Sequence, residues 1–277
     1  MDFAVPLAES TALLADQHQL VAINDALIEQ YLGEDWAFVY RNREYLFWGL
    51  IVTIALTLTS ILLGFLAGFP AGVIETYGSG YVHSFVRKFG VLLRGTPILV
   101  IMLFTYFALP LEPVYNAVQA GVNAFEVVLG PTPFTGPDVP DAFIAATIAL
   151  GFRSAAYQSQ IFRGALQSID DGQMEAARSI GMSRLEAIRH VIMPQALRRS
   201  VPGFQNEFTI VLKDTSIAFA IGLGELLRRS QDLFLQQTTA VLEVIIFISL
   251  IYFVLTFTTN RMLDALSTHF AIPGESS

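Results

Sequence analysis

The longest apolar run in the sequence spans residues 46–74 and carries no charged side chain. About 20 helical residues cross the hydrocarbon core of a bilayer, so this run is long enough to span it. A single segment surrounded by lipid must satisfy its own backbone hydrogen bonds, which favours an α-helix. Composition agrees, because 53% of the residues are hydrophobic and only 14% are charged. The sequence therefore predicts an all-α integral membrane protein.

Four further stretches are long and apolar enough to be spanning helices, so five transmembrane helices are expected. The five predicted spans are 46–74, 89–111, 142–162, 204–223 and 238–260. The third and fourth are unusually polar, since the third contains Arg153 and the fourth contains Glu207, Lys213 and Asp214.

The charges of the loops predict the orientation. Residues 112–141 contain four acids and no base, whereas residues 163–203 contain six arginines. The positive-inside rule places the arginine-rich loop in the cytoplasm. Five crossings then leave the N-terminus outside and the C-terminus in the cytoplasm. Because residues 112–141 are rich in Pro and Gly, we expect them to form an irregular outer loop.

The two ends of the chain lie outside this membrane domain, which is predicted to cover residues 45–268. Residues 1–44 hold eight acids and two bases and are interpreted as an acidic extracytoplasmic extension. Their apolar pairs recur every seven residues, which fits an amphipathic helix ended by Gly33 or, equally, a solvated tail. Residues 269–277 are expected to form a C-terminal tail.

Several classes of chemistry are excluded by the residues that the chain lacks. It has no cysteine, and its four histidines show no metal-ligand spacing, so no metal site is expected. The chain has two lysines, Lys88 and Lys213, and neither lies in the Gly-Lys-Ser/Thr sequence of a phosphate-binding loop. The net charge of -8 argues against nucleic-acid binding. The chain is thus expected to bind no cofactor and to catalyse no reaction.

The predicted cytoplasmic loop contains signals for two short helices. Asp170 and Asp171 suit a helix N-terminus, and Gly181 suits a C-terminal cap. Ser183-Arg184-Leu185-Glu186 then has the pattern of a capping box, and Pro194 is expected to end the second helix. A rigid helical elbow of this kind is suited to docking in a groove of another protein.

This loop resembles the EAA loop of ABC-importer permeases, since Glu175-Ala176-Ala177 precedes Gly181, and Val191-Ile192-Met193-Pro194 follows. Over residues 46–268 the chain is similar to the polar amino-acid uptake permeases of the histidine, glutamine and arginine type. The motifs that carry this resemblance include Arg94-Gly95-Thr96-Pro97, Ala156-Tyr157, Phe162-Arg163-Gly164, Pro194-Gln195-Ala196-Leu197-Arg198 and Lys213-Asp214-Thr215-Ser216.

The resemblance implies a permease subunit of an ATP-driven importer in a prokaryotic plasma (inner) membrane, carrying a polar amino acid. Its implied partners are an ABC ATPase that binds ATP and magnesium, a second permease copy or related chain, and an extracytoplasmic solute-binding protein. The 170–193 loop would couple the permease to the ATPase. The residues implied in coupling are Gly172, Glu175, Ala176, Ala177, Gly181 and Pro194.

Polar residues within the predicted spans are candidates for the substrate pathway, because ionisable groups in a membrane usually face a cavity or a partner. These candidates are Arg153, Tyr157, Gln160, Asn206, Lys213, Asp214, Thr215 and Ser216. Arg153 and Gln160 depart from the family pattern, where many relatives carry an uncharged residue and a glutamate. Arg153 could bind a substrate carboxylate bidentately, or an internal carboxylate could neutralise it.

A second interpretation is an ion-coupled secondary transporter of a small zwitterionic solute. In that protein Asp214 and Glu243 would be the coupling carboxylates. The predicted docking elbow argues against it, because a single-chain carrier needs no such element.

Overall fold

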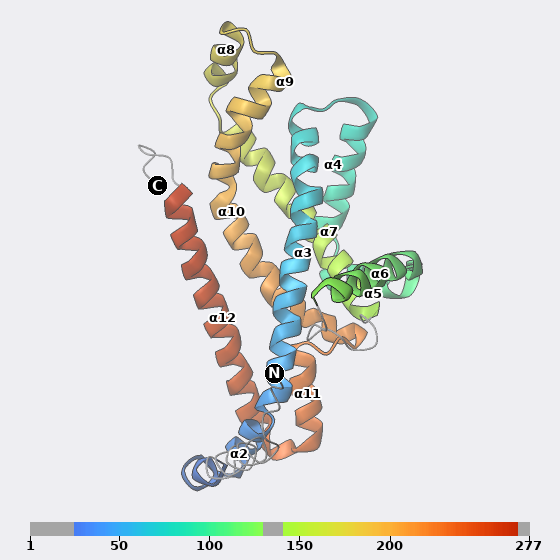
Figure 1. Cartoon of the computed structure of the whole chain (residues 1–277), viewed down its shortest axis with the longest axis vertical. Coiled ribbons are helices and arrows are strands. Elements are labelled where there is room, and N and C mark those ends of the chain that lie inside the picture. Colours follow the sequence, from blue (N-terminus) through green and yellow to red (C-terminus); the bar gives the residue numbers. More distant parts are fainter. Residues whose placement is uncertain (1–24, 130–140, 271–277) are drawn as a thin grey trace, which may run out of the picture.

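The structure, a computed structural model, describes residues 25–129 and 141–270, and these residues form helices without a β-strand. Figure 1 shows a bundle with α8 and α9 at one end and α2 and α11 at the other. The α-helices of the bundle are α2 (Glu34–Arg41), α3 (Arg43–Tyr77), α4 (Gly80–Gly95), α5 (Ile98–Ala108), α6 (Glu112–Leu129), α7 (Asp141–Gln167), α8 (Asp171–Ser179), α9 (Arg184–Ala187), α10 (Met193–Asp214), α11 (Leu226–Gln236) and α12 (Val241–Phe270).

Two of the described helical segments are long and apolar enough to cross a membrane. These are Arg43–Tyr77 and Thr238–Ala265, and the bent pair of α4 and α5 would make a third if it is one span. The first and last predicted spans are thus confirmed as apolar helices. The spans over 142–162 and 204–223 and the orientation stay predictions, and so does the count of five.

Helices α3 and α7 pack so closely that their contact face on α3 is built from small residues. A Cβ atom added at Gly68 would lie 2.7 Å from the backbone oxygen of Ala155, and one at Gly72 would lie 2.8 Å from that of Ser159. Glycine allows this approach because it has no side chain, and small residues four apart are a common interface between membrane helices. A larger residue at Gly68 would push α7 away.

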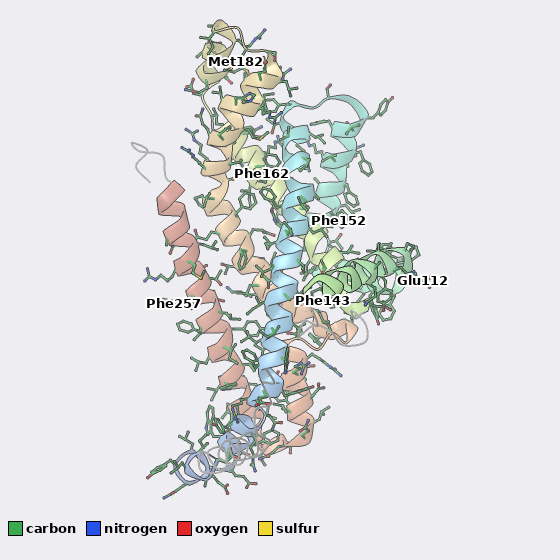
Figure 2. All side chains as sticks on the ribbon, viewed as in Figure 1. Glu112, Phe143, Phe152, Phe162, Met182 and Phe257 are labelled. Atoms are coloured by element: carbon green, nitrogen blue, oxygen red, sulfur yellow. The ribbon has the colours of Figure 1, made fainter. Side chains whose placement is uncertain are left out.

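Aromatic side chains join α10 to the same pair of helices. Phe162 of α7, labelled in Figure 2, is almost completely buried. Its ring centroid lies 4.6 Å from that of Phe69 on α3 and 4.6 Å from that of Phe204 on α10. Both contacts are edge-on, the arrangement that aromatic quadrupoles prefer. The three helices therefore share one packed centre.

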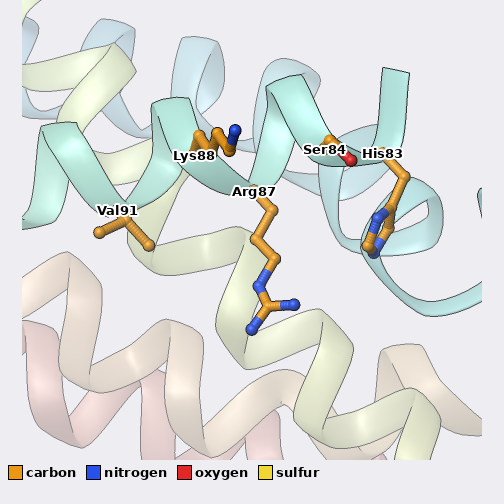
Figure 3. Close-up of a pocket in the computed structure, with 5 residues that line it drawn as sticks. All are labelled: His83, Ser84, Arg87, Lys88 and Val91. Atoms are coloured by element: carbon orange, nitrogen blue, oxygen red, sulfur yellow. The ribbon is translucent and has the colours of Figure 1, made fainter. Parts of the chain in front are cut away.

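The prediction of one continuous span over residues 89–111 is wrong. Helix α4 ends at Gly95, α5 begins at Ile98, and their axes differ by 108°. Pro97 explains the break, because proline has no N–H and disfavours helical geometry in the residue before it. Thr96 is accordingly extended, with φ -99° and ψ 131°. Figure 3 shows the polar side chains of the N-terminal half of α4.

The prediction of an irregular loop over 112–141 is wrong for its first part. Residues Glu112–Leu129 form helix α6. Most of the proline and glycine that suggested a loop lies in 130–140, outside the described residues. In 112–129 the apolar residues recur with helical spacing on both sides of the single glycine, Gly121. This spacing indicates a helix.

The prediction that Pro194 ends a helix is also wrong. After α9 the chain continues through one π-helical turn, Ile188–Ile192, directly into α10, with Pro194 in its first turn. Proline is tolerated in the first turn because its missing N–H needs no partner there. The wider π turn adjusts the register just before the proline. The elbow and the first half of the predicted fourth span, to Asp214, are thus parts of one continuous rod. The second half of that span does not continue the α-helix, because Thr215–Ile221 is a 3₁₀-helix that ends at Gly222.

The N-terminal extension is described from residue 25 onward, so most of the predicted amphipathic helix lies outside the described residues. Residues 25–32 are helical, and Gly33, with φ 95°, ends this segment as expected. Helix α2 follows and packs at the N-terminal end of α12. There the Asp35 carboxylate accepts hydrogen bonds from Gln237 Nε2 and Thr239 Oγ1, each at 2.7 Å.

Candidate functional site

An ion pair between Arg153 and Asp214 joins α7 to the C-terminal end of α10. Arg153 Nη1 donates to Asp214 Oδ2, and the two side chains are 16% and 22% exposed. The Arg153 guanidinium also lies over the ring of Tyr157, 5.1 Å from its centroid. A charge pair in a low-dielectric region is retained only where its geometry and hydrogen bonds offset the loss of water. Arg153 is therefore held by an internal carboxylate.

Glu207 places a second carboxylate beside this pair. It is seven residues before Asp214 on α10 and 2% exposed. It lies beside Ser154 of α7 and within electrostatic range of both charges of the Arg153–Asp214 pair. One of its oxygens, Oε1, is buried without a hydrogen-bond partner. The contact between α7 and α10 thus contains one cation and two carboxyl groups.

Lys213 does not take part in that cluster, although it is adjacent to Asp214. Its side chain is exposed and lines a cavity of about 440 Å³ between the end of α10 and α12. The lining residues are Lys213, Ser216, Ser249, Tyr252, Phe253 and Thr256. No carboxylate among the described residues forms an ion pair with Lys213. An ammonium group surrounded by hydroxyls is suited to bind a carboxylate.

The other pathway candidates on this part of the chain have local roles or lie apart. Thr215 is buried, and its hydroxyl donates to the Leu212 carbonyl at 2.7 Å. The Ser216 hydroxyl donates to the Lys213 carbonyl at the same distance. Both bonds occur where α10 passes into the 3₁₀-helix Thr215–Ile221. Asn206 is exposed on α10, next in sequence to Glu207.

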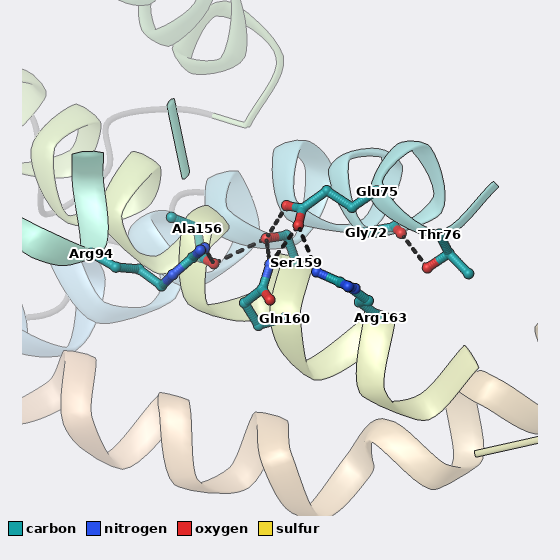
Figure 4. A network of polar contacts seen from close by, with 8 residues as sticks. All are labelled: Gly72, Glu75, Thr76, Arg94, Ala156, Ser159, Gln160 and Arg163. Carbon is teal, nitrogen blue, oxygen red and sulfur yellow. Dashed lines mark hydrogen bonds and ion pairs between the residues drawn. The ribbon is translucent and has the colours of Figure 1, made fainter. Parts of the chain in front are cut away.

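Gln160 belongs to a second polar cluster, built around Glu75 near the end of α3 (Figure 4). Glu75 Oε2 accepts from Gln160 Nε2 at 2.7 Å, and Oε1 accepts from Ser159 Oγ at 3.1 Å. Arg163 Nη1 lies 3.7 Å from Oε2, and the Glu75 side chain is 1% exposed. One turn away, Arg94 of α4 donates to the Ala156 carbonyl at 2.6 Å.

Sequence reasoning missed Glu75, although a signal was present. It is the first charge after the uncharged run 46–74 and thus the residue at which α3 leaves its apolar stretch. Its presence also accounts for Gln160. A glutamate at 160 would place two carboxylates in contact, whereas the amide of Gln160 donates to Glu75.

The predicted elbow is present and has the expected caps. The Asp170 side chain accepts from the Gly172 N–H at 2.7 Å and begins α8. Gly181 has φ 91° and ends it. The capping box is complete, since Glu186 Oε2 accepts from the Ser183 N–H at 2.8 Å and the Ser183 hydroxyl accepts from the Glu186 N–H at 3.3 Å.

Two large apolar side chains stand exposed at the tip of the elbow. Ile180 is 76% and Leu185 is 75% exposed, whereas Ala177 and Ala187 are buried inside it. Glu175 and Ala176 lie on the exposed surface of α8. Exposed apolar residues on a rigid, capped element are typical of a protein contact. The six predicted coupling residues are therefore brought to one structural unit, with Pro194 at its base.

The elbow also contacts the end of α3. The Arg184 guanidinium lies 5.8 Å from the centroid of the Tyr77 ring, two residues beyond Glu75. Arg199 on α10 donates to the hydroxyl of Ser168, which precedes α8, at 3.1 Å. The elbow is thus attached to both α3 and α10. In the part of the chain that the structure describes, no group of three acids or histidines could hold a metal ion.

Comparisons with known proteins agree with this arrangement. The family described as binding-protein-dependent transport system inner membrane component matches residues 60–271. The glutamine transport system permease protein GlnP of Escherichia coli K12 is 32% identical over 238 residues, which are 86% of this chain and 98% of that protein. The glutamate/aspartate import permease protein GltK of Escherichia coli O157:H7 is 27% identical over 237 residues, which are again 86% of this chain and 98% of that protein.

A solved structure has a similar fold. It is a crystal structure of an amino acid ABC transporter with histidines, 30% identical, with a TM-score of 0.66. The match covers 83% of this chain and 95% of that one. The chain therefore belongs to the family of binding-protein-dependent transport system inner membrane components and is a protein of the inner membrane.

Proposed function

We propose that this chain is the transmembrane permease subunit of an ATP-driven importer of a polar amino acid. The relatives support this class of substrate, because one is named for glutamine and another for glutamate and aspartate. The chain itself performs no covalent chemistry. ATP and magnesium are bound by a separate ATPase, and an extracytoplasmic solute-binding protein delivers the substrate.

The observation that carries the proposal is the elbow with its exposed Ile180 and Leu185. A capped, rigid unit with an apolar tip is of little use to a carrier that works alone, but it suits a groove in a partner. Two ATPase subunits dock on the elbows of two permeases, which are copies of this chain or one copy and a related chain. Closure of the ATPase pair pushes the elbows.

The continuity of the elbow with α10 suggests how this movement reaches the membrane. Helix α10 runs from Met193 next to the elbow to Asp214 beside Arg153, without an intervening loop. Movement of the elbow would tilt this rod and with it the position of Lys213. Alternating access then follows from rocking of the helices about a site within the membrane.

The cavity at Lys213 is the proposed contact for the substrate carboxylate. Lys213 supplies an ammonium group that pairs with no carboxylate among the described residues, and Ser249 and Thr256 supply hydroxyls. On the α7 side of α10, Arg153 uses Nη1 in its pair with Asp214, so its other N–H groups remain candidates for a separate carboxylate contact.

The proposal is tested by transport in vesicles that contain the complete complex. Uptake of labelled glutamine, glutamate or histidine is expected to require ATP and to survive an ionophore. Ile180→Asp should abolish ATP-driven uptake, because it places a charge at the docking tip. Leu235→Asp, at a position that is 84% exposed on α11, is the matched control and should transport normally. Uptake that collapses with the ionophore and ignores ATP would support the ion-coupled carrier instead.

A further inference from the structure

Helix α4 carries an excess of positive charge that no acidic residue neutralises in the part of the chain that the structure describes. Its sequence contains Arg87, Lys88 and Arg94 and no acid. Arg94 is bonded to the Ala156 carbonyl of α7. Arg87 and Lys88 are both exposed, and neither forms a hydrogen bond or ion pair with a described residue. These two cations are thus available to a ligand.

The free cations line a surface cavity of about 300 Å³. It is formed by His83, Ser84, Arg87, Lys88 and Val91. Figure 3 shows His83 and Arg87 extending from the same side of α4, one turn apart. The Ser84 hydroxyl and the half-buried His83 ring add hydrogen-bonding groups to the two positive charges. Such a set of donors fits a phosphate group.

An exposed apolar stripe runs along α4 beside this cavity. Tyr81, Phe85, Phe89 and Leu92 are 96%, 68%, 40% and 62% exposed. The Phe85 and Phe89 rings are stacked, with centroids 5.8 Å apart. At 3.6 residues per turn, Lys88 falls between the cationic face and this stripe. A ligand with a charged head and apolar chains would contact both faces at once.

The position of α4 indicates where such a ligand comes from. Helix α4 begins at Gly80, separated by two residues from the end of α3 at Tyr77, and this start lies at the end of the bundle that carries the elbow (Figure 1). Arg87 is seven residues further on, about 10 Å along the helix axis. With residue 80 at the membrane surface, long cationic side chains at this distance would still reach the headgroup layer. Val91 and Leu92 lie one turn further along the helix and would contact acyl chains.

We propose that the N-terminal half of α4 binds an anionic phospholipid of the leaflet on the elbow side. Arg87, Lys88 and Ser84 hold the headgroup phosphate, and one acyl chain lies along Phe85, Phe89 and Leu92. An acidic protein segment is the less suitable occupant, since the stripe beside the cations is too apolar for a solvated peptide. The lipid fixes α4 next to Glu75 and the elbow and so makes transport depend on membrane composition.

The test uses the intact complex in nanodiscs of phosphatidylcholine with a minor share of phosphatidylglycerol. Lipid that remains bound after detergent extraction is quantified by mass spectrometry. A cation near an anionic surface contributes roughly fivefold to binding. Arg87→Gln with Lys88→Gln should therefore reduce retained phosphatidylglycerol by at least about tenfold. The conservative pair Arg87→Lys with Lys88→Arg should retain it.

Arg261→Gln, on the exposed surface of α12 near its C-terminal end, is the matched control and should leave phosphatidylglycerol retention unchanged. Equal loss in this control would overturn the assignment to α4 in favour of general surface charge. Displacement of the lipid by inorganic phosphate alone would show a free-phosphate site instead. Loss of the ATPase from the Arg87→Gln/Lys88→Gln complex, with lipid retained, would show a protein contact and also overturn the proposal.

Discussion

Lys213 and Asp214 are neighbours in the sequence but serve different helices. Asp214 pairs with Arg153 of α7, whereas Lys213 faces the cavity lined by α12. Adjacent helical residues differ in direction by about 100°, so the end of α10 can present opposite charges to two sides. One charge holds two helices together, and the other forms no ion pair with a described residue.

Removing Lys213 should weaken substrate binding without disturbing the fold. Lys213→Met is expected to raise the KM for uptake by about tenfold, since a charged hydrogen bond of about 1.5–3 kcal/mol is lost. Lys213→Arg keeps the charge and should be much less affected. Transport kinetics in vesicles measure both. A KM unchanged in Lys213→Met would exclude the cavity as the carboxylate site.

Arg153→Gln should abolish uptake while leaving assembly with the ATPase intact. It leaves the Asp214 carboxylate without its cation, which should also lower the free energy of unfolding by about 1.5–3 kcal/mol. Adding Asp214→Asn should recover part of that stability, because no unpaired charge remains. Denaturation of the purified variants and their uptake are measured side by side. Normal uptake by Arg153→Gln would refute a role in transport.

The Glu75 cluster predicts a charge-swap rescue. Gln160→Glu alone puts two carboxylates in contact and should destabilise the protein by about 1–3 kcal/mol. The double variant Glu75→Gln with Gln160→Glu restores one acid and one amide and should recover most of the loss. Thermal unfolding of the native protein, Gln160→Glu, Glu75→Gln and the double variant measures the interaction. Two effects that simply add would show that the residues do not interact.

Substitution of Gly181 should strain the backbone rather than cause a steric clash. Its φ is 91°, and no atom lies within 4 Å of where a Cβ would be. Gly181→Val should therefore strain the elbow by about 1–3 kcal/mol and uncouple ATP hydrolysis from transport. Gly181→Asn, which tolerates positive φ better, should stay largely coupled. The ratio of ATP hydrolysed to substrate moved is the measurement, and equal ratios in both variants would refute this reasoning.

The capping box of α9 should respond to acid. Hydrogen bonding to the Ser183 side chain, and then to its backbone N–H, lowers the pKa of the Glu186 carboxyl below its usual value of 4.5. A lowered pKa stabilises the folded turn above pH 4.5, and this contribution is lost as the pH falls through the lowered value. Glu186→Gln should remove the pH dependence. Amide exchange at 183–187, corrected for intrinsic rates, would reveal it, and pH-independent protection in the native protein would contradict it.

The elements with a local physical signature were predictable from the sequence. The uncharged run 46–74 lies in α3, and the caps at Asp170, Gly181 and Ser183 form as expected, because each depends on a few neighbouring residues. The predicted helix boundaries were wrong at two prolines, because a proline is compatible with more than one local structure. Pro194 can end a helix or stand in its first turn, and here it stands in the first turn; Pro97 breaks a run whose only charged residue is Arg94.

The pairings between helices were beyond the sequence. Arg153 had Asp214, Glu207 and Glu243 as possible partners, and only the packing of α7 on α10 selects Asp214. Glu75 and Gln160 are 85 residues apart, and no periodicity links them. The cavity at Lys213 likewise depends on where α12 lies against α10.

The most direct test of the account is site-specific cross-linking from the elbow. The chain has no cysteine, so Ile180→Cys introduces the only thiol. Leu235→Cys, at the opposite end of the bundle, is the control. In native membranes, we expect a thiol cross-linker on Ile180→Cys to capture a P-loop ATPase and the same reagent on Leu235→Cys to capture none. Failure to capture an ATPase from Ile180→Cys, in membranes where uptake is active, would contradict coupling through the elbow.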